Sequence, residues 1–206
     1  MNISYPKKII KLLINLTFKP HNIFRYLRYS IFSNKTPIDI KLPWWSFDGI
    51  DELKKISKNK VIFEYGTGGS TILLSKVAKK IICVEDDIKW LKKIKKYFNK
   101  NSKVKILYKP FNFDNPKNFK NSNYLKCVKN YNWDILIIDG QDKSFNERIE
   151  VFRFNEKKNL KNKVIILDDF WRYEKILKNN KAKRIKVFES VGPCRIGVTS
   201  TAFFYY

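Results

Sequence analysis

The stretch 61-VIFEYGTGGSTILLS-75 decides the fold of this chain. An apolar run of strand length, Val61–Tyr65, is followed first by Gly66, Gly68 and Gly69 and then by a second apolar segment. Three of the seven glycines therefore lie within four positions. Glycine concentrated between a strand and a helix predicts a backbone turn that a ligand can approach closely.

Alternation of strand and helix continues along the rest of the chain. Apolar runs typical of strands lie at 60–65, 80–85, 103–108, 133–139, 163–169, 184–188 and 197–206, and amphipathic segments typical of helices lie at 70–80, 86–98 and 144–158. This order predicts an α/β fold with a doubly wound, mostly parallel seven-stranded sheet. The alternating polar and apolar residues of the last run predict an antiparallel C-terminal strand, at the edge or in a hairpin.

The 206 residues suit a single domain, which we place at 42–206, preceded by a basic amphipathic N-terminal arm at 1–41. Residues 1–36 alternate Lys or Arg with large apolar residues, which predicts one or two helices broken at Pro20. Such an arm suits an anionic membrane surface or a partner. Packing against this domain, or against a second copy in a homo-oligomer, is an equally open alternative.

The formal net charge of +24 invites an interpretation as an RNA-binding protein. Seven of the 43 basic residues are arginine, however, and the remaining 36 lysines are scattered among Asn, Ile, Phe and Tyr. Phosphate clamps favour the planar fork of arginine, so a general compositional bias explains the charge better. An RNA-directed enzyme or RNA-binding protein that uses the lysine-rich surface stays an alternative.

Cysteine and histidine usage narrows the chemistry further. Cys83, Cys127 and Cys194 are far apart and have no metal-ligand spacing, so we expect reduced thiols and a cytoplasmic protein. No apolar run is long enough to span a membrane. The single histidine, His21, argues against catalytic triads and multi-histidine metal sites, and we expect it at the surface.

Carboxylates follow four of the predicted strands, at Glu64, Glu85-Asp86, Asp139 and Asp168-Asp169. Ligands of doubly wound sheets bind at these carboxyl ends. A phosphate-binding Walker loop needs a lysine after its glycines, and here Ser70 and Thr71 follow instead. Thr71 also replaces the third glycine of a dinucleotide fingerprint, and Glu64 would repel a pyrophosphate. S-adenosylmethionine, a cation with a ribose and no phosphate, meets these conditions.

The quoted motifs resemble a known family. Glu64-x-Gly66-x-Gly68, with Val84-Glu85 at the end of the second strand, resembles motifs one and two of class I S-adenosylmethionine-dependent methyltransferases. The ordered set LPWWSFDGIDEL (42–53), FEYGTGGST (63–71), CVEDDIKW (83–90), IIDG (137–140) and VIILDDFWRY (164–173) is similar to a small, single-domain, bacterial-type subgroup. The resemblance implies the Rossmann-like methyltransferase fold.

It also implies a cofactor site at the first two strand ends. Glu64 would act near the amino group of the cofactor, Glu85 would hold the ribose hydroxyls, and Asp86 would lie near the adenine. The alternative for Glu85 is a charge favoured by a helix N-terminus, and for Asp86 and Asp87 a helix cap. The full implied set is Glu64, Gly66, Gly68, Gly69, Ser70, Glu85 and Asp86.

Asp139, Asp168 and Asp169 are the candidate catalytic residues. They resemble the Mg²⁺ ligands of catechol-type and macrocin-type O-methyltransferases, which implies a metal held by these three carboxylates. A metal-free alternative makes one of them the general base for the acceptor hydroxyl. In the third alternative, Asp168 or Asp169 only caps a helix that begins near Trp171.

We expect a methyltransferase that modifies an oxygen of a small hydroxylated acceptor such as a sugar. The acceptor would bind between Trp44, Trp45 and the loops after Asp139 and Asp169, because adjacent tryptophans are costly to expose and so are buried or line a pocket. A protein that kept this fold without catalysis, and that acts at a membrane surface or on a partner, is the remaining alternative.

Overall fold

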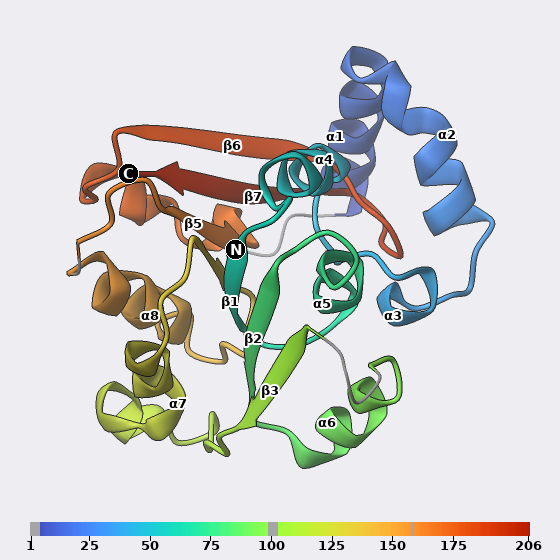
Figure 1. Cartoon of the computed structure of the whole chain (residues 1–206). Helices are drawn as coiled ribbons and strands as arrows, with labels where there is room; N and C mark the ends of the chain where they lie inside the picture. Colours follow the sequence, from blue (N-terminus) through green and yellow to red (C-terminus); the bar gives the residue numbers. More distant parts are fainter. Residues whose placement is uncertain (1–4, 99–102, 158) are drawn as a thin grey trace.

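The computed structural model describes residues 5–98, 103–157 and 159–206. Its strands form a seven-stranded sheet in the order β3-β2-β1-β4-β5-β7-β6 (Figure 1). Strands β1 to β5 pair in parallel, and β7 is antiparallel to both of its neighbours. The predicted fold is confirmed, and the last strand forms a hairpin with β6 that places it inside the sheet. The strands are β1 Val61–Tyr65, β2 Lys80–Glu85, β3 Val104–Tyr108, β4 Ile135–Ile138, β5 Val164–Asp168, β6 Arg184–Val191 and β7 Val198–Tyr205.

Helices cover both faces of the sheet, as the uninterrupted apolar strands require. One face packs against α8 and the short turns before β4, and the other packs against α4 and α5. The helical elements after the arm are α4 Phe47–Ile56, α5 Gly69–Leu74, α6 Ile88–Lys95, η3 Pro116–Asn121, α7 Asn123–Lys126, η4 Cys127–Asn130, α8 Glu147–Glu156, η5 Phe170–Arg172 and η6 Glu174–Lys178.

Side chains at the starts of the helices satisfy backbone amides that the helices leave free. Ser46 accepts a hydrogen bond from the amide of Gly49 at the start of α4. The carboxylate of Asp87 accepts from the amides of Lys89 and Trp90, at 2.7 and 3.2 Å, and starts α6. The predicted cap therefore falls on Asp87.

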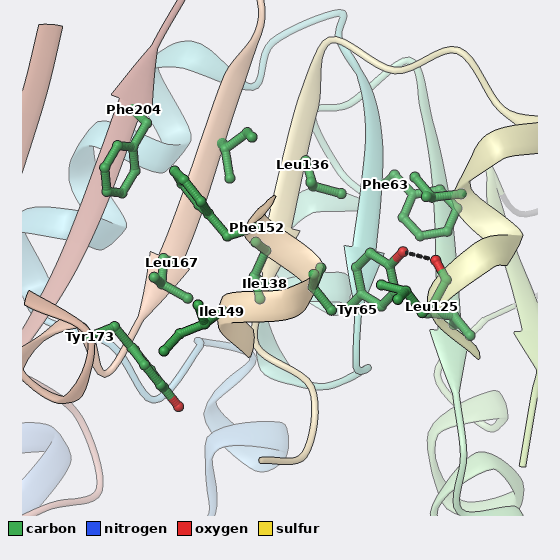
Figure 2. Close-up of a cluster of buried hydrophobic side chains, with 14 of the residues drawn as sticks. Phe63, Tyr65, Leu125, Leu136, Ile138, Ile149, Phe152, Leu167, Tyr173 and Phe204 are labelled. Atoms are coloured by element: carbon green, nitrogen blue, oxygen red, sulfur yellow. Dashed lines mark hydrogen bonds between the residues drawn. The ribbon is translucent and has the colours of Figure 1, made fainter. Parts of the chain in front are cut away.

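Tyr65 connects β1 to the irregular segment between β3 and β4. Its ring is fully buried, and its centroid lies 5.3 Å from that of Phe63 and 5.5 Å from that of Tyr124. Its hydroxyl donates a 2.6 Å hydrogen bond to the carbonyl of Leu125 (Figure 2). A buried hydroxyl without a partner costs about 1–3 kcal/mol, so this bond fixes the segment against the sheet.

The N-terminal arm packs against its own domain. Arg25 forms a two-pronged pair with Asp51 of α4, with nitrogen–oxygen distances of 2.6 and 3.1 Å, and Tyr26 is buried beneath α4 and β7. Asn15 and Val191 of β6 are hydrogen-bonded at 3.2 Å. The arm contains α1 Tyr5–Phe18, η1 Pro20–Asn22, α2 Ile23–Tyr26, η2 Leu27–Ile31 and α3 Pro37–Ile40, so the predicted helix break at Pro20 is observed; its residues 1–4 lie outside the described part.

The outward side of the arm remains apolar. Phe18, Phe24 and Phe32 are 81%, 82% and 79% exposed, and Ile10, Leu13 and Ile14 are also exposed. Within the described residues, no helix has both the length and the apolar composition needed to cross a bilayer. His21 lies at the surface as expected, and the three cysteines are free thiols.

Candidate functional site

A cavity of about 520 Å³ opens at the carboxyl ends of β1, β4 and β5. The strand order reverses between β1 and β4, and such a switch point is where doubly wound sheets bind their ligands. The volume lies within the range of small-molecule sites, about 300–1,000 Å³. The glycine turn after β1 forms one side of the cavity, and Asp139, Asp168 and Asp169 form the other.

The three glycines of the turn serve three different purposes. Gly66 has a φ of +91°, and a Cβ there would lie 3.0 Å from the carbonyl oxygen of Asp139. A Cβ on Gly69 would lie 1.9 Å from the carbonyl oxygen of Leu42, so Gly69 admits the backbone of residues 37–42, and it also lines the cavity. A Cβ on Gly68 would meet no described atom within 4 Å, and Gly68 lines the cavity. Gly68 is therefore the glycine that is open to a ligand.

Glu64 lies at the bottom of the cavity with 1% of its surface exposed. Its two carboxyl oxygens accept hydrogen bonds from Ser70 and Thr71, the latter at 2.7 Å. Burial raises the pKa of Glu64 to about 8, despite these hydroxyls. The hydroxyl of Ser70, predicted to bind the cofactor, thus holds Glu64 in place. Glu64 is therefore a buried acid with a raised pKa, and a nearby cation would favour its charged form.

Glu85 and Asp86 lie beside the cavity without lining it. One oxygen of Glu85 accepts from the backbone amides of Asp86 and Asp87, at 3.0 and 3.1 Å, and the other accepts from the hydroxyl of Thr67 at 2.6 Å. Burial raises the pKa of Glu85, and that of Asp86 to about 6. Thr67 lines the cavity, so it separates Glu85 from the open space.

Asp139 follows β4 and is held on both oxygens. Oδ2 accepts from the indole nitrogen of Trp45 at 2.9 Å, and Oδ1 lies 3.2 Å from Nη2 of Arg148. Burial raises the pKa of Asp139, and Arg148 and Trp45 oppose that rise. Trp45 is fully buried and lies outside the cavity wall, so the predicted direct contact between Trp45 and a substrate does not fit its position. Trp44 is 52% exposed and lines the cavity.

Asp168 and Asp169 differ in environment although they are adjacent. Asp168 is 4% exposed and accepts from the hydroxyl of Thr201 at 2.8 Å, and burial raises its pKa well above the usual value. Asp169 has a φ of +51° and lines the cavity. Neither carboxylate caps the helical turn that begins at Phe170. The backbone amide of Trp171 donates to the hydroxyl of Ser200 instead, and the side chain of Asp169 accepts no capping hydrogen bond. The helix-cap alternative is therefore wrong.

The three aspartates do not form the predicted magnesium site. No group of three acidic, histidine or cysteine side chains with a metal-binding arrangement exists among the described residues. Arg148 is the cation that faces Asp139, and the hydroxyl of Thr201 donates a hydrogen bond to Asp168. A dication beside this guanidinium would be repelled, so the pair of Arg148 and Asp139 does not favour a metal at Asp139.

Several lining residues escaped the sequence analysis. Trp90 donates from its indole to the carbonyl of Thr67 at 2.8 Å, and the predicted arm supplies part of the wall through Thr36, Pro37 and Ile38. The charged residues missed are Lys93, Arg148, Arg172 and Arg195. The one available signal was the rarity of arginine in this lysine-rich chain.

The fold is shared with methyltransferases of known structure. An O-methyltransferase from Bacillus cereus in complex with SAH superposes with a TM-score of 0.61 at 16% identity, over 88% of this chain and 96% of that one. The O-methyltransferase TomG from Streptomyces achromogenes, in complex with SAM, gives 0.57 at 11% identity, over 98% and 99%. An rRNA methylase from Streptococcus thermophilus gives 0.54 at 9% identity, over 84% and 98%.

No family model and no curated protein sequence matches the chain. The superpositions cover 88% and 98% of this chain and therefore include the sheet with its antiparallel β7. The chain therefore has the Rossmann-like fold of class I methyltransferases.

Proposed function

We propose that this protein is an S-adenosylmethionine-dependent methyltransferase that modifies a hydroxyl group of a small acceptor such as a sugar. One observation carries the proposal: a single cavity joins the open glycine turn at Gly68 to the carboxylates of Asp139 and Asp169. Proteins that share this fold are crystallised with SAM or SAH. The two sides of the cavity suit a cationic cofactor and an acceptor hydroxyl, respectively.

The glycine-turn side suits the charge of the cofactor. S-adenosylmethionine, when bound, supplies a methyl group on a sulfonium centre. Glu64 gains a negative charge if a cation displaces its proton, and Gly68 leaves space for close backbone approach. Glu85 would accept the ribose hydroxyls only after Thr67 gives up its 2.6 Å hydrogen bond, so its role requires a small movement of the turn.

On the acceptor side, Asp169 is the group that we propose to take the hydroxyl proton. Asp169 lines the cavity, and within the described residues its carboxylate accepts only a long hydrogen bond, from the hydroxyl of Thr199 at 3.5 Å. Asp139 is held by Trp45 and Arg148, and Asp168 by Thr201. Asp139 and Asp168 therefore shape the site, whereas Asp169 is available to an incoming hydroxyl.

Isothermal calorimetry with S-adenosylmethionine and S-adenosylhomocysteine tests the proposal directly. We expect both to bind the wild type, and Glu85→Ala to weaken binding. Glu174→Ala removes the same charge from an exposed position outside the cavity and should bind like the wild type. Failure of the wild type to bind either molecule would rule out the enzyme, and unchanged binding by Glu85→Ala would rule out only the ribose assignment.

The arm supports a second candidate function, attachment to an anionic membrane. Phe18 and Phe24 are exposed on the same arm as exposed basic residues such as Lys7 and Arg28, the combination found on helices that lie in a membrane interface. Sedimentation with phosphatidylglycerol vesicles should retain the wild type and lose the double variant Phe18→Ser/Phe24→Ser. Tyr97→Ser, at an exposed aromatic just after α6 and outside the arm, is the control. Equal sedimentation of all three would exclude this function.

The RNA-directed alternative stays a prediction from composition. It requires binding of generic RNA that weakens steeply with salt, with a slope set by the number of neutralised phosphates. A filter-binding titration at several salt concentrations measures that slope.

A further inference from the structure

Arginine is concentrated at the cavity. Three of the seven arginines, Arg148, Arg172 and Arg195, line it, whereas of the 36 lysines only Lys93 does so among the described residues. In a chain with this bias toward lysine, arginine marks positions where a planar, multidentate cation matters. The cavity is therefore one place where this protein concentrates guanidinium groups.

Arg148 is fully engaged within the protein. Its Nε donates to the carbonyl of Gly140 at 2.8 Å, its Nη1 to the carbonyl of Asp168 at 3.1 Å, and its Nη2 lies 3.2 Å from Asp139. The side chain is 12% exposed. Arg148 connects the ends of β4 and β5 and has little capacity left for a ligand.

Arg172 and Arg195 are different. Their Nη2 atoms lie 4.0 and 3.9 Å from the two carboxyl oxygens of Asp169, which is beyond hydrogen-bond length. Their side chains are 32% and 22% exposed. Two guanidinium groups thus flank one carboxylate, which leaves a surplus of positive charge on both sides of Asp169.

Aromatic rings hold both guanidinium groups in place. Arg172 lies over the rings of Trp171 and Phe145, 4.8 and 5.2 Å from their centroids, and Arg195 lies 5.5 Å from the ring centroid of Trp44 and donates to its carbonyl at 3.0 Å. Such stacking fixes the planes of the two forks before a ligand arrives. A preorganised pair of forks is suited to a planar or tetrahedral acid group.

Arg195 also lines a smaller cavity of about 190 Å³, together with Trp171, Ile196 and Lys8. This second cavity extends the acceptor side toward the arm, away from the glycine turn. Trp44 and Trp171, at 52% and 44% exposure, flank the arginines at the shared rim. The rim therefore combines apolar ring faces with cationic forks.

We infer that the acceptor of the proposed methyltransferase is anionic: it carries a carboxylate or a phosphate that binds between Arg172 and Arg195 while the hydroxyl to be methylated faces Asp169. The inference rests on the proposed function for the transfer step, and on the two arginines alone for the binding of the acid group. Both carboxylate and phosphate offer two or more oxygens to a guanidinium fork.

Calorimetry on the S-adenosylhomocysteine-saturated protein, at constant ionic strength, provides the test. The probes are glucose, glucuronate and glucose 6-phosphate, which share a ring and differ in the acid group. The variants are Arg172→Gln, Arg195→Gln and, as a charge-matched control, Arg184→Gln. Arg184 lies on β6, stacked on Tyr205 and outside the cavity, so its loss changes the net charge equally.

We expect the wild type to bind at least one anionic probe about tenfold or more tightly than glucose, since a charged hydrogen bond contributes about 1.5–3 kcal/mol. Arg172→Gln and Arg195→Gln should lose about that factor, whereas Arg184→Gln should lose little. A preference for glucuronate identifies a carboxylate, and a preference for glucose 6-phosphate identifies a phosphate.

Three results would overturn the inference. The first is binding of glucose as tight as that of both anions. The second is a loss of anion binding in Arg184→Gln as large as in the cavity variants, which would reveal general attraction to a basic protein. The third is weaker S-adenosylhomocysteine binding by Arg172→Gln or Arg195→Gln, which would assign the arginines to the cofactor carboxylate. If the wild type binds anions through the pair but no S-adenosylhomocysteine, the proposed function fails and the anion site stands.

Discussion

Nη2 of Arg148 lies 3.2 Å from Oδ1 of Asp139, and the indole of Trp45 donates to the other oxygen of the same carboxylate at 2.9 Å. The three residues come from α8, the end of β4 and the segment before α4. A carboxylate held in this way has a fixed orientation and a local counter-charge. The centre of the site is therefore an arginine–aspartate pair in the position where the sequence predicts a metal.

Methyl transfer should not depend on magnesium. Because Arg148 already faces Asp139, we expect the rate of S-adenosylhomocysteine formation to be the same in EDTA and in added Mg²⁺. The measurement needs an accepted substrate, and the panel of anionic sugars above supplies candidates. Loss of activity in EDTA, restored by Mg²⁺, would contradict this arrangement.

Arg148→Gln should destabilise the fold. It leaves Asp139 and two strand-end carbonyls without their donor in a site that is largely buried, and breaking such a pair costs about 3–5 kcal/mol. Urea unfolding measures the change. Arg153→Gln, at an exposed position of the same helix, should change stability by less than about 0.5 kcal/mol. Similar losses in both variants would show that helix propensity, and not the buried pair, is responsible.

Glu64 should make stability depend on pH. Its pKa rises from 4.5 to about 8 on folding, so between these values the folded state holds a proton that the unfolded state releases. The free energy of unfolding therefore falls as pH rises through this window, on the order of 1 kcal/mol per pH unit. Glu64→Gln should lower this slope in urea titrations, with the remainder due to other buried acids such as Asp168, whereas Glu174→Gln should keep it in full. A wild-type slope that persists in Glu64→Gln would place the ionisation elsewhere.

The two neighbouring glycines, Gly68 and Gly69, should respond oppositely to alanine. A Cβ on Gly69 would collide with the carbonyl of Leu42, so Gly69→Ala should cost about 1–3 kcal/mol of stability. Gly68→Ala meets no described atom within 4 Å and has extended backbone, so stability should hold while S-adenosylhomocysteine binding weakens. Unfolding and calorimetry on both variants separate the effects. Weak binding together with low stability in Gly68→Ala would contradict its assignment to the ligand.

Asp169 and Asp168 should also differ. Asp169→Asn removes the proposed base and should lower kcat about 100-fold or more with little change in the KM for S-adenosylmethionine. Asp168 has a strongly raised pKa through burial and accepts from Thr201, so the neutral amide in Asp168→Asn replaces it with a much smaller loss. Equal losses of kcat in the two variants would remove the distinction between base and support.

Much of the fold and half of the site follow from local sequence patterns. Continuous apolar strands separated by amphipathic helices predict a parallel sheet with two covered faces, because no other arrangement buries them. The glycines after β1 and the carboxylates after β1, β2, β4 and β5 are close to a strand end by chain connectivity alone. Gly66, Gly68, Glu64 and Asp169 are therefore at the cavity as predicted from strand ends.

Long-range packing decided the rest. Trp44 and Trp45 are indistinguishable by position in the sequence, yet one lines the cavity and the other is buried on Asp139, 94 residues away. Arg172 and Arg195 meet at Asp169 because the hairpin of β6 and β7 returns beside β5. Residues 37–42 cross the glycine turn only because Gly69 has no Cβ. Strand periodicity determines which residues reach the edge of the sheet, whereas strand order and side-chain packing determine which of them face one another.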